Sequence, residues 1–376
     1  MLITHSHVEI FLGMYNPYIW PCVALWAFDR FLRICRIAYL NLSACKGTAT
    51  YNAESNVIRI NVPHRKLSNP GPGTYCFVYI LNGLKLWESH PFTIASWTNT
   101  TSESEKGSLP QNTCTFAVRP HDSFTARLRD QILRRNDTES STGESGSQIR
   151  VVMEGPYGVS HSTQDFDSAL MIIGGSGISV ALAHVRALCE ALAKKDPVAL
   201  RKVHLVWAVR DIALFQDHFD HEISPLWLNG PDSLASKINV QLSLYVTGTG
   251  PGQKIQNVQS RSTSPTDSTR SDGLLEKSEL GPTAAHVSHV NDKTGPSVAV
   301  GKVAAELDEK ISFFSHRPDV HDIVVTAAQA EAVNGRRMAV VSCGPARMAD
   351  DARAGVVAAL GKRCEGVEFL PETFGW

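Results

Sequence analysis

The glycine-rich turn Gly174–Ser179 (GGSGIS) has the clearest chemical potential in this chain. The apolar run Ser168–Ile173 before it is typical of a buried strand, and the pattern of Val180–Ala193 after it predicts a helix. A strand, a glycine-rich turn and a helix in this order direct backbone N–H groups and a helix N-terminus at a phosphate. We therefore interpret the turn as a phosphate-binding loop.

Arg210 refines this interpretation, because it ends the next predicted strand, Lys202–Val209. A Rossmann site for NAD places an acidic residue on the ribose about 20 residues after the turn, and no residue here stands in a clear position for that role. A guanidinium is always charged and holds a phosphate through two donors, so Arg210 suits an adenosine 2′-phosphate. The alternative is that Arg210 only pairs with its neighbour Asp211.

Strands that alternate with helices surround this turn. After Lys202–Val209, strands are predicted for Gln241–Val246 and Met338–Ser342, and a helix for Ala346–Leu360. This alternation predicts a parallel sheet with helices on both faces, in which Met338–Ser342 is the last clear parallel strand. The tract 248–301 is rich in Ser, Thr, Gly and Pro, so we expect a disordered insertion there.

The middle of the chain has a different pattern, in which short runs of residues alternate between apolar and polar side chains. Such runs predict a small antiparallel barrel, interrupted by one helix at Thr125–Leu133. Two polar tracts, 98–112 and 135–146, are interpreted as surface loops. The predicted strands are Val57–Pro63, Tyr75–Ile80, Thr115–Arg119 and Gln148–Met153, with a turn at Gly71–Thr74.

The amino-terminal stretch Ile10–Phe28 carries no charged residue, and its length approaches the ~20 residues that cross a bilayer. Arg30, Arg33 and Arg36 follow at helical spacing, which places this end and the rest of the chain in the cytosol. The pattern predicts a membrane helix or a membrane-surface helix, and a spanning helix here would be either a minimal anchor or the tail of a larger membrane domain. The alternative is an amphipathic helix packed on the soluble part.

Composition excludes some other classes of protein. The 36 Lys and Arg residues nearly balance 37 Asp and Glu residues, and this net charge of −1 gives no broad basic surface for nucleic acid. The 8 cysteines are scattered, without a Cys-x-x-Cys pair, so we expect neither a zinc site nor an iron–sulfur cluster. We interpret them as reduced thiols of a cytosolic domain.

Five short motifs in one order carry a resemblance to a known family. The chain resembles the flavin- and nicotinamide-binding half of the ferric reductases, a family related to the NADPH oxidases and, more distantly, to the ferredoxin–NADP reductases. The resemblance runs from Trp20 to Trp376. The motifs are His90–Ser96 (HPFTIAS), Glu154–Gly158 (EGPYG), Gly174–Ser179 (GGSGIS), Cys343–Pro345 (CGP) and Phe374–Trp376 (FGW).

The resemblance implies an α/β fold with a β-barrel, of the ferredoxin reductase-like kind. Residues 1–45 would form the membrane helix and its basic cytosolic flank. Residues 46–160 would form an FAD-binding antiparallel β-barrel. Residues 161–376 would form a parallel-sheet NADP-binding domain that contains the insertion 248–301.

The resemblance also implies roles for residues of the barrel. His90 would reach the flavin pyrophosphate, Phe92 would pack on the isoalloxazine, and Thr93 would hydrogen-bond near its reactive nitrogen. Thr125 would cap a helix at the pyrophosphate turn, in which Ser123 stands where the family has Gly. The EGPYG motif would lie near the nucleotides at the domain boundary, or it is a tight turn. The FAD-binding residues implied are His90, Pro91, Phe92, Thr93, Arg119, Thr125, Gly155 and Gly158.

In the second domain the GGSGIS turn would hold the NADPH pyrophosphate. Cys343 would lie beside the nicotinamide, and Trp376 would stack on the flavin until the nicotinamide displaces it. The alternatives are a buried structural cysteine and a frayed carboxyl terminus. The catalytic residues implied are Thr93, Cys343 and Trp376, and the NADPH-binding residues are Gly174, Gly175, Ser176, Gly177, Ile178, Ser179, Arg210, Cys343, Gly344 and Pro345.

The implied activity is electron transfer from NADPH through FAD to membrane haems and then to a ferric chelate, at a membrane such as the plasma membrane. We expect no haem within this chain, because His5 and His7 are two residues apart and no spaced His pair is present. One alternative is transfer to oxygen, as in an NADPH oxidase. Another is an inactive partner of a full-length reductase.

Overall fold

The computed structural model describes residues 2–41, 46–64, 67, 70–81, 88–98, 112–121, 124–139, 146–224, 234–248 and 311–372. The side chains of residues 2–17 are not described. The predicted insertion 248–301 lies outside the described residues except for Gly248. The predicted FGW motif lies wholly outside them.

The middle of the chain forms a seven-stranded antiparallel sheet in the order β4-β3-β7-β1-β2-β6-β5. Strands β4 and β5 stand at opposite edges of this order, yet only Ile94 and Ala95 separate them in the chain. The sheet must therefore curl until its edges meet: Ile94 N donates to Thr74 O and Ala95 N donates to Thr115 O. The strands are β1 (Lys46–Asn52), β2 (Val57–His64), β3 (Tyr75–Ile80), β4 (Ser89–Thr93), β5 (Ser96–Thr98), β6 (Asn112–Val118) and β7 (Ser147–Tyr157).

The predicted barrel is thus confirmed, and its core is the inward face of these strands. Ile58, Ile60 and Phe116 are fully buried there with Trp97. The helix between β6 and β7 is α2 (Phe124–Glu139), which runs further than the predicted Thr125–Leu133. The tract from residue 135 therefore begins as helix, and the prediction of a loop from that residue is wrong. Long straight-chain residues such as Arg134 and Arg135 are compatible with either state, so composition alone did not separate them.

The second sheet is parallel, with the order β11-β10-β9-β8-β12-β13. The order reverses between β8 and β12, and open sheets of this kind bind ligands outside the carboxyl ends of the strands at that point. The prediction that Met338–Ser342 is the last parallel strand is wrong, because β13 follows it at the sheet edge. The strands are β8 (Ser168–Gly174), β9 (Lys202–Val209), β10 (Asn239–Val246), β11 (Ile311–Phe314), β12 (Met338–Cys343) and β13 (Val367–Pro371).

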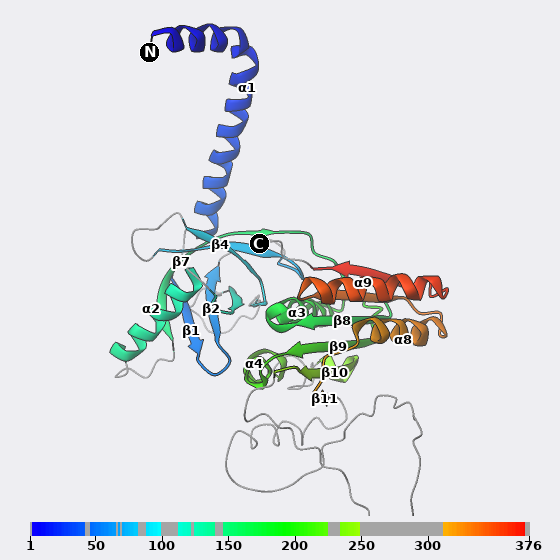
Figure 1. Ribbon diagram of the computed structural model, residues 1–376. Coiled ribbons are helices and arrows are strands. Elements are labelled where there is room, and N and C mark those ends of the chain that lie inside the picture. The colour runs from blue at the N-terminus through cyan, green and yellow to red at the C-terminus, as the bar shows by residue number, and fades with distance from the viewer. Residues whose placement is uncertain are drawn as a thin grey trace, which may run out of the picture.

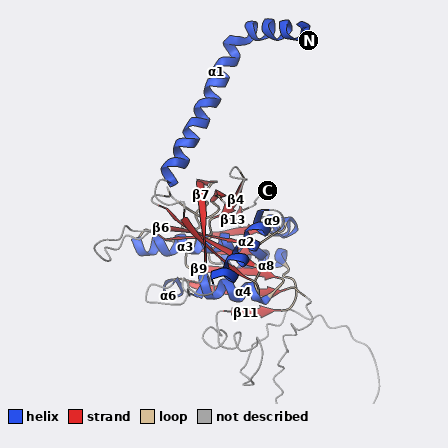
Figure 2. Ribbon diagram, turned by 90° about the vertical axis from the view of Figure 1, so that its left-hand side faces the viewer, coloured by secondary structure: helices blue, strands red, loops and turns tan. Residues whose placement is uncertain are grey.

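Helices cover both faces of this parallel sheet (Figures 1 and 2). On one face α3 (Ile178–Lys194) and α4 (Ile212–His218) pack on Met171, Leu205 and Trp207. On the other face α8 (Val320–Ala332) and α9 (Ala346–Gly361) pack on Leu170 and Val340. The short segments are η1 (Gly175–Gly177), η2 (Phe219–Ile223) and α6 (Leu234–Lys237).

The amino-terminal helix α1 (Leu2–Asn41) stands away from the two sheets in Figure 1. Its described half exposes large apolar side chains, including Trp20, Leu25 and Trp26. Its last residue docks on the barrel, because Asn41 Nδ2 donates to Met153 O at 2.8 Å and Met153 N donates to Asn41 Oδ1 at 2.9 Å. The predicted helix is confirmed, and its place in a membrane stays a prediction.

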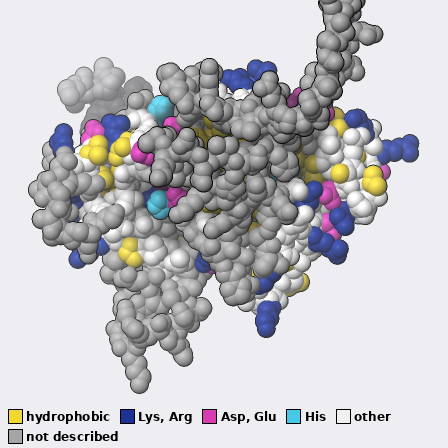
Figure 3. All heavy atoms as spheres, turned by 90° about the horizontal axis from the view of Figure 1, so that it is seen from below, with side chains coloured by type: hydrophobic (Ala, Val, Ile, Leu, Met, Phe, Trp, Pro, Cys, Tyr) yellow, Lys and Arg dark blue, Asp and Glu magenta, His cyan; other side chains and the backbone are white. Residues whose placement is uncertain are grey.

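By length and mean hydropathy, one stretch of the described residues could span a bilayer, namely Gly175–Lys194. This stretch is α3 with the turn before it, and Val180, Leu182 and Val185 are buried in the core of the parallel-sheet domain. Its apolar character is therefore explained by packing. Where Figure 3 shows described side chains, both basic and acidic groups are present.

Candidate functional site

The carboxyl ends of β8 and β12 touch through their glycines. A Cβ at Gly177 would lie 2.6 Å from the carbonyl oxygen of Cys343, and one at Gly174 would lie 2.6 Å from Cδ of Pro345. Carbon atoms do not approach backbone or ring atoms this closely, so glycine is required at both positions. The GGSGIS and CGP motifs, about 170 residues apart in sequence, therefore form one continuous surface at the point where the strand order reverses.

Two helices begin at this surface without a capping side chain. The residues before α3 and α9 are Gly177 and Pro345, which make no side-chain cap, and neither helix has an acidic residue in its first turn. In contrast, Asp211 and Asp319 cap α4 and α8, each accepting a backbone N–H bond. Uncapped helix N-termini retain free N–H donors and partial positive charge, which is the environment that a phosphate needs.

The turn has free space at Gly175, and a hydrogen bond from Trp207 fixes its backbone. A Cβ at Gly175 would meet nothing within 4 Å, and Trp207 Nε1 donates to the carbonyl oxygen of Gly175 at 3.0 Å. Ser179 Oγ donates to Ser176 O at 3.4 Å, across the start of α3. The cradle that these residues form fits a dinucleotide pyrophosphate.

Arg210 is exposed directly after β9, at the same edge of the sheet. Its neighbour Asp211 uses its carboxylate to cap α4, because Asp211 Oδ1 accepts from Ala213 N at 3.0 Å. The cap gives Asp211 a role that needs no partner in Arg210. Arg210 lies at the edge where the turn lies, and its contact with a 2′-phosphate stays a prediction.

Cys343 is buried, with 4% of its surface exposed, at the end of β12. Burial, together with the nearby Glu372 carboxylate, raises the pKa of its thiol to about 12. The thiol is therefore protonated at neutral pH and is no nucleophile. A neutral, polarisable side chain at this position suits packing against a flat ring.

Glu372 is a residue of this region that the sequence did not reveal. It follows β13, its backbone N donates to Ser342 O at 3.0 Å, and burial raises the pKa of its carboxyl to about 7. Its carboxylate lies against Gly73, where a Cβ would overlap it. The only sequence signal is the alternation of Val367–Pro371, which is too short to identify an edge strand beside an acid.

Gly73 joins the two domains at this place. It belongs to the predicted turn Gly71–Thr74, which is confirmed by the bond from Thr74 N to Gly71 O at 3.2 Å. Its carbonyl oxygen also lies beside Gly158, which has a φ of +99° and contacts Tyr75. Tyr75 pairs in register with Thr93 of β4. An unbroken chain of contacts thus leads from Thr93 across the domain boundary to Cys343 and Gly177.

On the barrel, β4 lies against the start of α2. The ring of His90 stacks on Phe124 at 4.3 Å between centroids, and Phe92 lies 6.2 Å from Phe124 and 6.5 Å from Phe116. His90 Nε2 is 3.5 Å from Oε1 of Glu88. Pro91, Phe92 and Thr93 are half-buried. These rings form an aromatic wall that borders the start of α2, and helix N-termini suit phosphate groups. The flavin contacts of His90, Phe92 and Thr93 stay predictions.

The predicted cap at Thr125 is wrong in its detail. α2 begins at Phe124, so Thr125 lies inside the first turn, and its Oγ1 accepts from His121 N at 2.9 Å. The hydroxyl ties down the segment before the helix and leaves the helix N–H groups alone. Arg119 is exposed at the end of β6 beside this segment, and Ser123 lies outside the described residues.

The EGPYG motif divides between two tasks. Gly158 lies beside Gly73 at the domain boundary, Gly155 packs against Cys76 of β3 inside the barrel, and Glu154 is buried. Glu154 accepts bonds from Arg33 Nε at 2.7 Å, Tyr157 at 2.6 Å and Tyr79 at 2.9 Å. Burial opposes its ionisation, but these donors outweigh burial and lower the pKa of Glu154. The acid of the motif therefore anchors α1 rather than facing a nucleotide.

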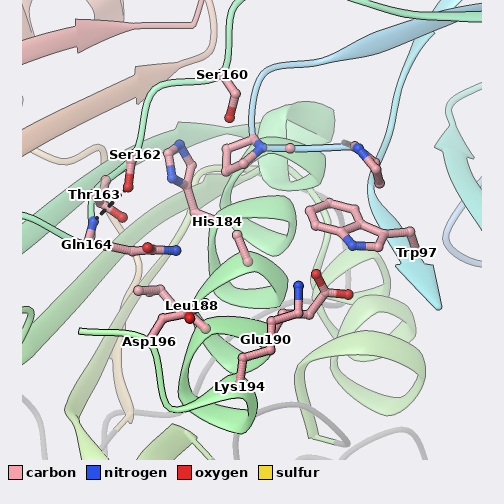
Figure 4. A pocket seen from close by; sticks show the side chains of 15 residues that line it. Trp97, Ser160, Ser162, Thr163, Gln164, His184, Leu188, Glu190, Lys194 and Asp196 are labelled. Atoms are coloured by element: carbon pink, nitrogen blue, oxygen red, sulfur yellow. Dashed lines mark hydrogen bonds between the residues drawn. The ribbon is translucent and has the colours of Figure 1, made fainter. Parts of the chain in front are cut away.

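A separate cavity of about 300 Å³ lies between α3 and the barrel (Figure 4). Its walls include Trp97 of β5, His184 and Leu188 of α3, and the segment Ser160–Gln164 between the domains. His184 is 1% exposed, and burial lowers the pKa of its imidazole to about 3, so the ring is neutral. The described part of the chain offers no hydrogen-bond partner to either ring nitrogen. The interface is thus incompletely packed here.

Among the described residues no group of three or more His, Cys, Asp or Glu side chains could hold a metal ion. An antiparallel barrel with an aromatic wall, joined to a parallel sheet with a glycine-rich turn before a helix, is typical of flavin- and nicotinamide-dependent oxidoreductases. Two family models agree: residues 42–161 match an FAD-binding domain, and residues 166–357 match the ferric reductase NAD binding domain. The second match covers more than half of the chain, and the chain belongs to the ferric reductase family.

The predicted family is therefore confirmed, and so are FAD and a nicotinamide coenzyme. The chain is 26% identical over 355 residues to ferric reductase transmembrane component 6 of Saccharomyces cerevisiae, covering 93% of this chain and 40% of the relative. It is 27% identical over 380 residues to ferric/cupric reductase transmembrane component 2 of the same yeast, covering 99% and 44%. The chain thus spans less than half the length of these relatives.

Among solved structures, the ferredoxin reductase in carbazole 1,9a-dioxygenase aligns with 87% of this chain and 69% of its own, at 15% identity and a TM-score of 0.43. That score is too low to establish a shared fold. The fold assignment rests on the two strand orders and the two family models.

Proposed function

We propose that this chain is the electron-transfer part of a membrane-bound, NADPH-dependent ferric-chelate reductase. The observation that carries the proposal is the chain of contacts from Thr93 to Cys343. It brings the aromatic wall of the barrel and the phosphate-binding edge of the parallel sheet to one boundary, where a flavin ring and a nicotinamide ring would meet.

The parallel-sheet domain would hold the coenzyme. Gly174–Ser179 and the start of α3 would bind its pyrophosphate, and Arg210 would bind the 2′-phosphate, so NADPH is preferred over NADH. Cys343, Gly344 and Pro345 would border the nicotinamide. Because the Cys343 thiol stays protonated, its part is to pack and to exclude water.

The barrel would hold FAD. When bound, FAD supplies the chemistry that side chains lack, since it accepts a hydride and releases electrons singly. Phe92 would shield the ring, Thr93 would hydrogen-bond to it, and His90 with Arg119 and the start of α2 would hold the pyrophosphate. Gly155 and Gly158 would lie near the bound nucleotides at the domain boundary. Trp376, outside the described residues, would stack on the flavin in the absence of nicotinamide.

The electrons would leave towards the membrane, to a haem and finally to a ferric chelate. The relatives are named as transmembrane components, and α1 exposes apolar side chains along its described length. Arg33 and Arg36 would mark the cytosolic surface, since both contact β7 at the base of this helix. In this arrangement the two nucleotide domains would lie in the cytosol beneath the membrane.

The proposal is tested by measuring NADPH-driven reduction of ferricyanide and of ferric and cupric chelates by the purified chain, with and without added FAD. We expect reduction that requires FAD, and the double variant His90→Ala with Thr93→Ala should bind FAD more weakly. A parallel assay for superoxide separates the oxidase alternative. A colourless protein that neither binds FAD nor oxidises NADPH would contradict the proposal and support an inactive partner.

A further inference from the structure

Arg59 is a buried cation of the barrel that points out of it, towards the parallel-sheet domain. Side chains alternate along β2, so Ile58 and Ile60 enter the barrel core while Val57 packs in the core of the parallel-sheet domain. Arg59 shares the outward face with Val57 and is only 7% exposed. The β2 strand therefore contributes one face to each domain.

The guanidinium of Arg59 binds two carboxylates of the other domain. Its Nε donates to Glu222 Oε1 at 2.6 Å and its Nη2 donates to Glu222 Oε2 at 3.0 Å. Its Nη1 donates to Asp217 Oδ2 at 2.7 Å, and Nη2 also donates to Asp217 O at 3.2 Å. From β1, Asn52 Nδ2 donates to Asp217 Oδ1 at 2.8 Å. We call Arg59, Asn52, Asp217 and Glu222 the Arg59 clamp.

The local helix geometry is what allows one guanidinium to reach both acids. Asp217 and Glu222 are five residues apart, and in an α-helix they would face different directions. The segment Phe219–Ile223 is instead a π-helical turn, and the bond from Ser224 N to Phe219 O spans five residues. Such a turn brings residues five apart to one side of the helix. The π-helical turn therefore lies at the place where Asp217 and Glu222 both bind Arg59.

Two histidines complete the surroundings of the clamp. His218 Nδ1 lies 2.9 Å from Glu222 Oε2, and His221 Nδ1 lies 2.8 Å from Asp217 O. The Glu222 carboxylate is therefore fixed by a bond within its own domain as well as by Arg59, while His221 holds the backbone carbonyl of Asp217. Because the guanidinium donors point in fixed directions at fixed acceptors, they constrain the relative orientation of the two domains, whereas an apolar contact is not directional.

We propose that Arg59 is a positioning residue, which sets the orientation of the parallel-sheet domain on the barrel and thereby aligns nicotinamide with flavin. The effect on the alignment of nicotinamide with flavin rests on the proposed function. The cavity beside α3 shows that close packing does not fix this interface everywhere. In addition, α4 connects the clamp at Asp217 with Arg210 and Asp211 at the coenzyme edge.

The test is anaerobic mixing of the FAD-loaded chain with NADPH. The bleaching of the flavin gives a rate constant that describes only the molecules that react. We expect Arg59→Met to lower this rate constant roughly 10- to 100-fold, because a misplacement of about 1 Å can cost about 100-fold. Arg59→Lys keeps the charge but loses the fork, so its rate constant should be intermediate. Bound FAD, the amplitude and the half-saturating NADPH concentration should stay near wild type.

The isotope effect separates positioning from a loss of folded protein. With NADPH deuterated at the transferred hydrogen, the isotope effect on bleaching should rise in Arg59→Met, whereas a smaller folded fraction lowers only the amplitude. Arg337→Met is the control, since Arg337 pairs with Glu368 inside the parallel-sheet domain. It should leave the rate constant unchanged. An Arg59→Met rate constant equal to wild type would overturn the proposal.

One further measurement keeps the inference independent of the proposed function. If wild type binds FAD but is not bleached by NADPH, the proposed function fails, and the clamp is then judged by calorimetry. We expect a single unfolding transition in wild type and two in Arg59→Met, and one transition in both would overturn the clamp. If Arg59→Met does not fold, Arg59→Lys and Glu222→Gln carry the same comparison.

Discussion

The two nucleotide-binding halves hold their motifs by different means. In the parallel-sheet half the motifs meet through backbone atoms, as when Gly177 touches the carbonyl of Cys343. In the barrel half the motif side chains reach to distant elements, as when Glu154 binds Arg33 across 121 residues of sequence. Glycine spacing in the sequence is enough to predict a site built from backbone atoms. A site built from side chains depends on which distant elements pack beside it.

The difference also concerns robustness. Side-chain bonds can be replaced by other donors or by water, but a glycine at a backbone contact cannot accept any Cβ. We therefore expect single changes in the parallel-sheet half to affect coenzyme use strongly. Changes in the barrel half should act more on stability and docking.

The largest effect should come from Gly177→Ala. A Cβ placed 2.6 Å from a carbonyl oxygen forces the β8 and β12 ends apart, at a cost of roughly 1–3 kcal/mol for overpacking. The kcat/KM for NADPH should fall by up to about 100-fold, with FAD binding retained. Gly361→Ala is the matched control, because nothing lies within 4 Å of a Cβ there. An NADPH response equal to that of Gly361→Ala would contradict the backbone contact.

Arg210→Ala should have the next largest effect. Loss of a charge-assisted bond to the 2′-phosphate should raise KM for NADPH by the equivalent of roughly 1.5–3 kcal/mol, and leave KM for NADH nearly unchanged. Steady-state kinetics with both coenzymes measure this difference. Equal changes in the two KM values would show that Arg210 contacts no 2′-phosphate.

Glu154→Ala tests the barrel half. It removes the acceptor shared by Arg33, Tyr79 and Tyr157, and leaving such donors unpaired costs roughly 1–3 kcal/mol of unfolding free energy. Because Arg33 is 37% exposed, water compensates part of that loss. Glu154→Gln should restore part of the stability. Thermal unfolding of the three proteins makes the comparison, and a KM for NADPH that rises as in Arg210→Ala would place Glu154 with the coenzyme instead.

Glu372 should produce the smallest effect, visible in the pH dependence of stability. Its folded pKa of about 7 lies above the ordinary value of 4.5, because burial disfavours the charged form. Between these values the native state binds more protons than the unfolded state, so this residue lowers stability as pH rises. Glu372→Gln should remove that decline. Denaturant titrations at several pH values measure this change of unfolding free energy with pH. If it is the same in both proteins, Glu372 does not titrate with a raised pKa in the folded state.

Sequence patterns predicted the elements that are long, apolar and regular. Tyr75–Ile80 and Lys202–Val209 were predicted with the bounds that the structure shows, because β-branched and aromatic residues fill both runs. The strand Val367–Pro371 was missed because an edge strand of five residues that ends in proline has little pattern of its own.

The predictions for the site follow the same physical division. The place of the glycine turn was predicted because a strand and a helix flank it in the sequence, and the CGP end was identified through the resemblance. The partners of Glu154, Arg59 and Glu372 were not, since each depends on an element far away in sequence or on a π-helical turn. The hydroxyl of Thr125 was assigned to a cap because serine and threonine at helix starts usually cap, and the structure moves the helix start by one residue.

The most direct measurement is the anaerobic reduction of the FAD-loaded chain by NADPH and by NADH. We predict that NADPH bleaches the bound flavin fully, that NADH does so much more slowly at equal concentration, and that Gly177→Ala keeps its FAD but responds to NADPH up to about 100-fold more slowly. Bound FAD that NADPH does not bleach, although NADPH binds, would contradict the claim that the two halves bring flavin and nicotinamide together.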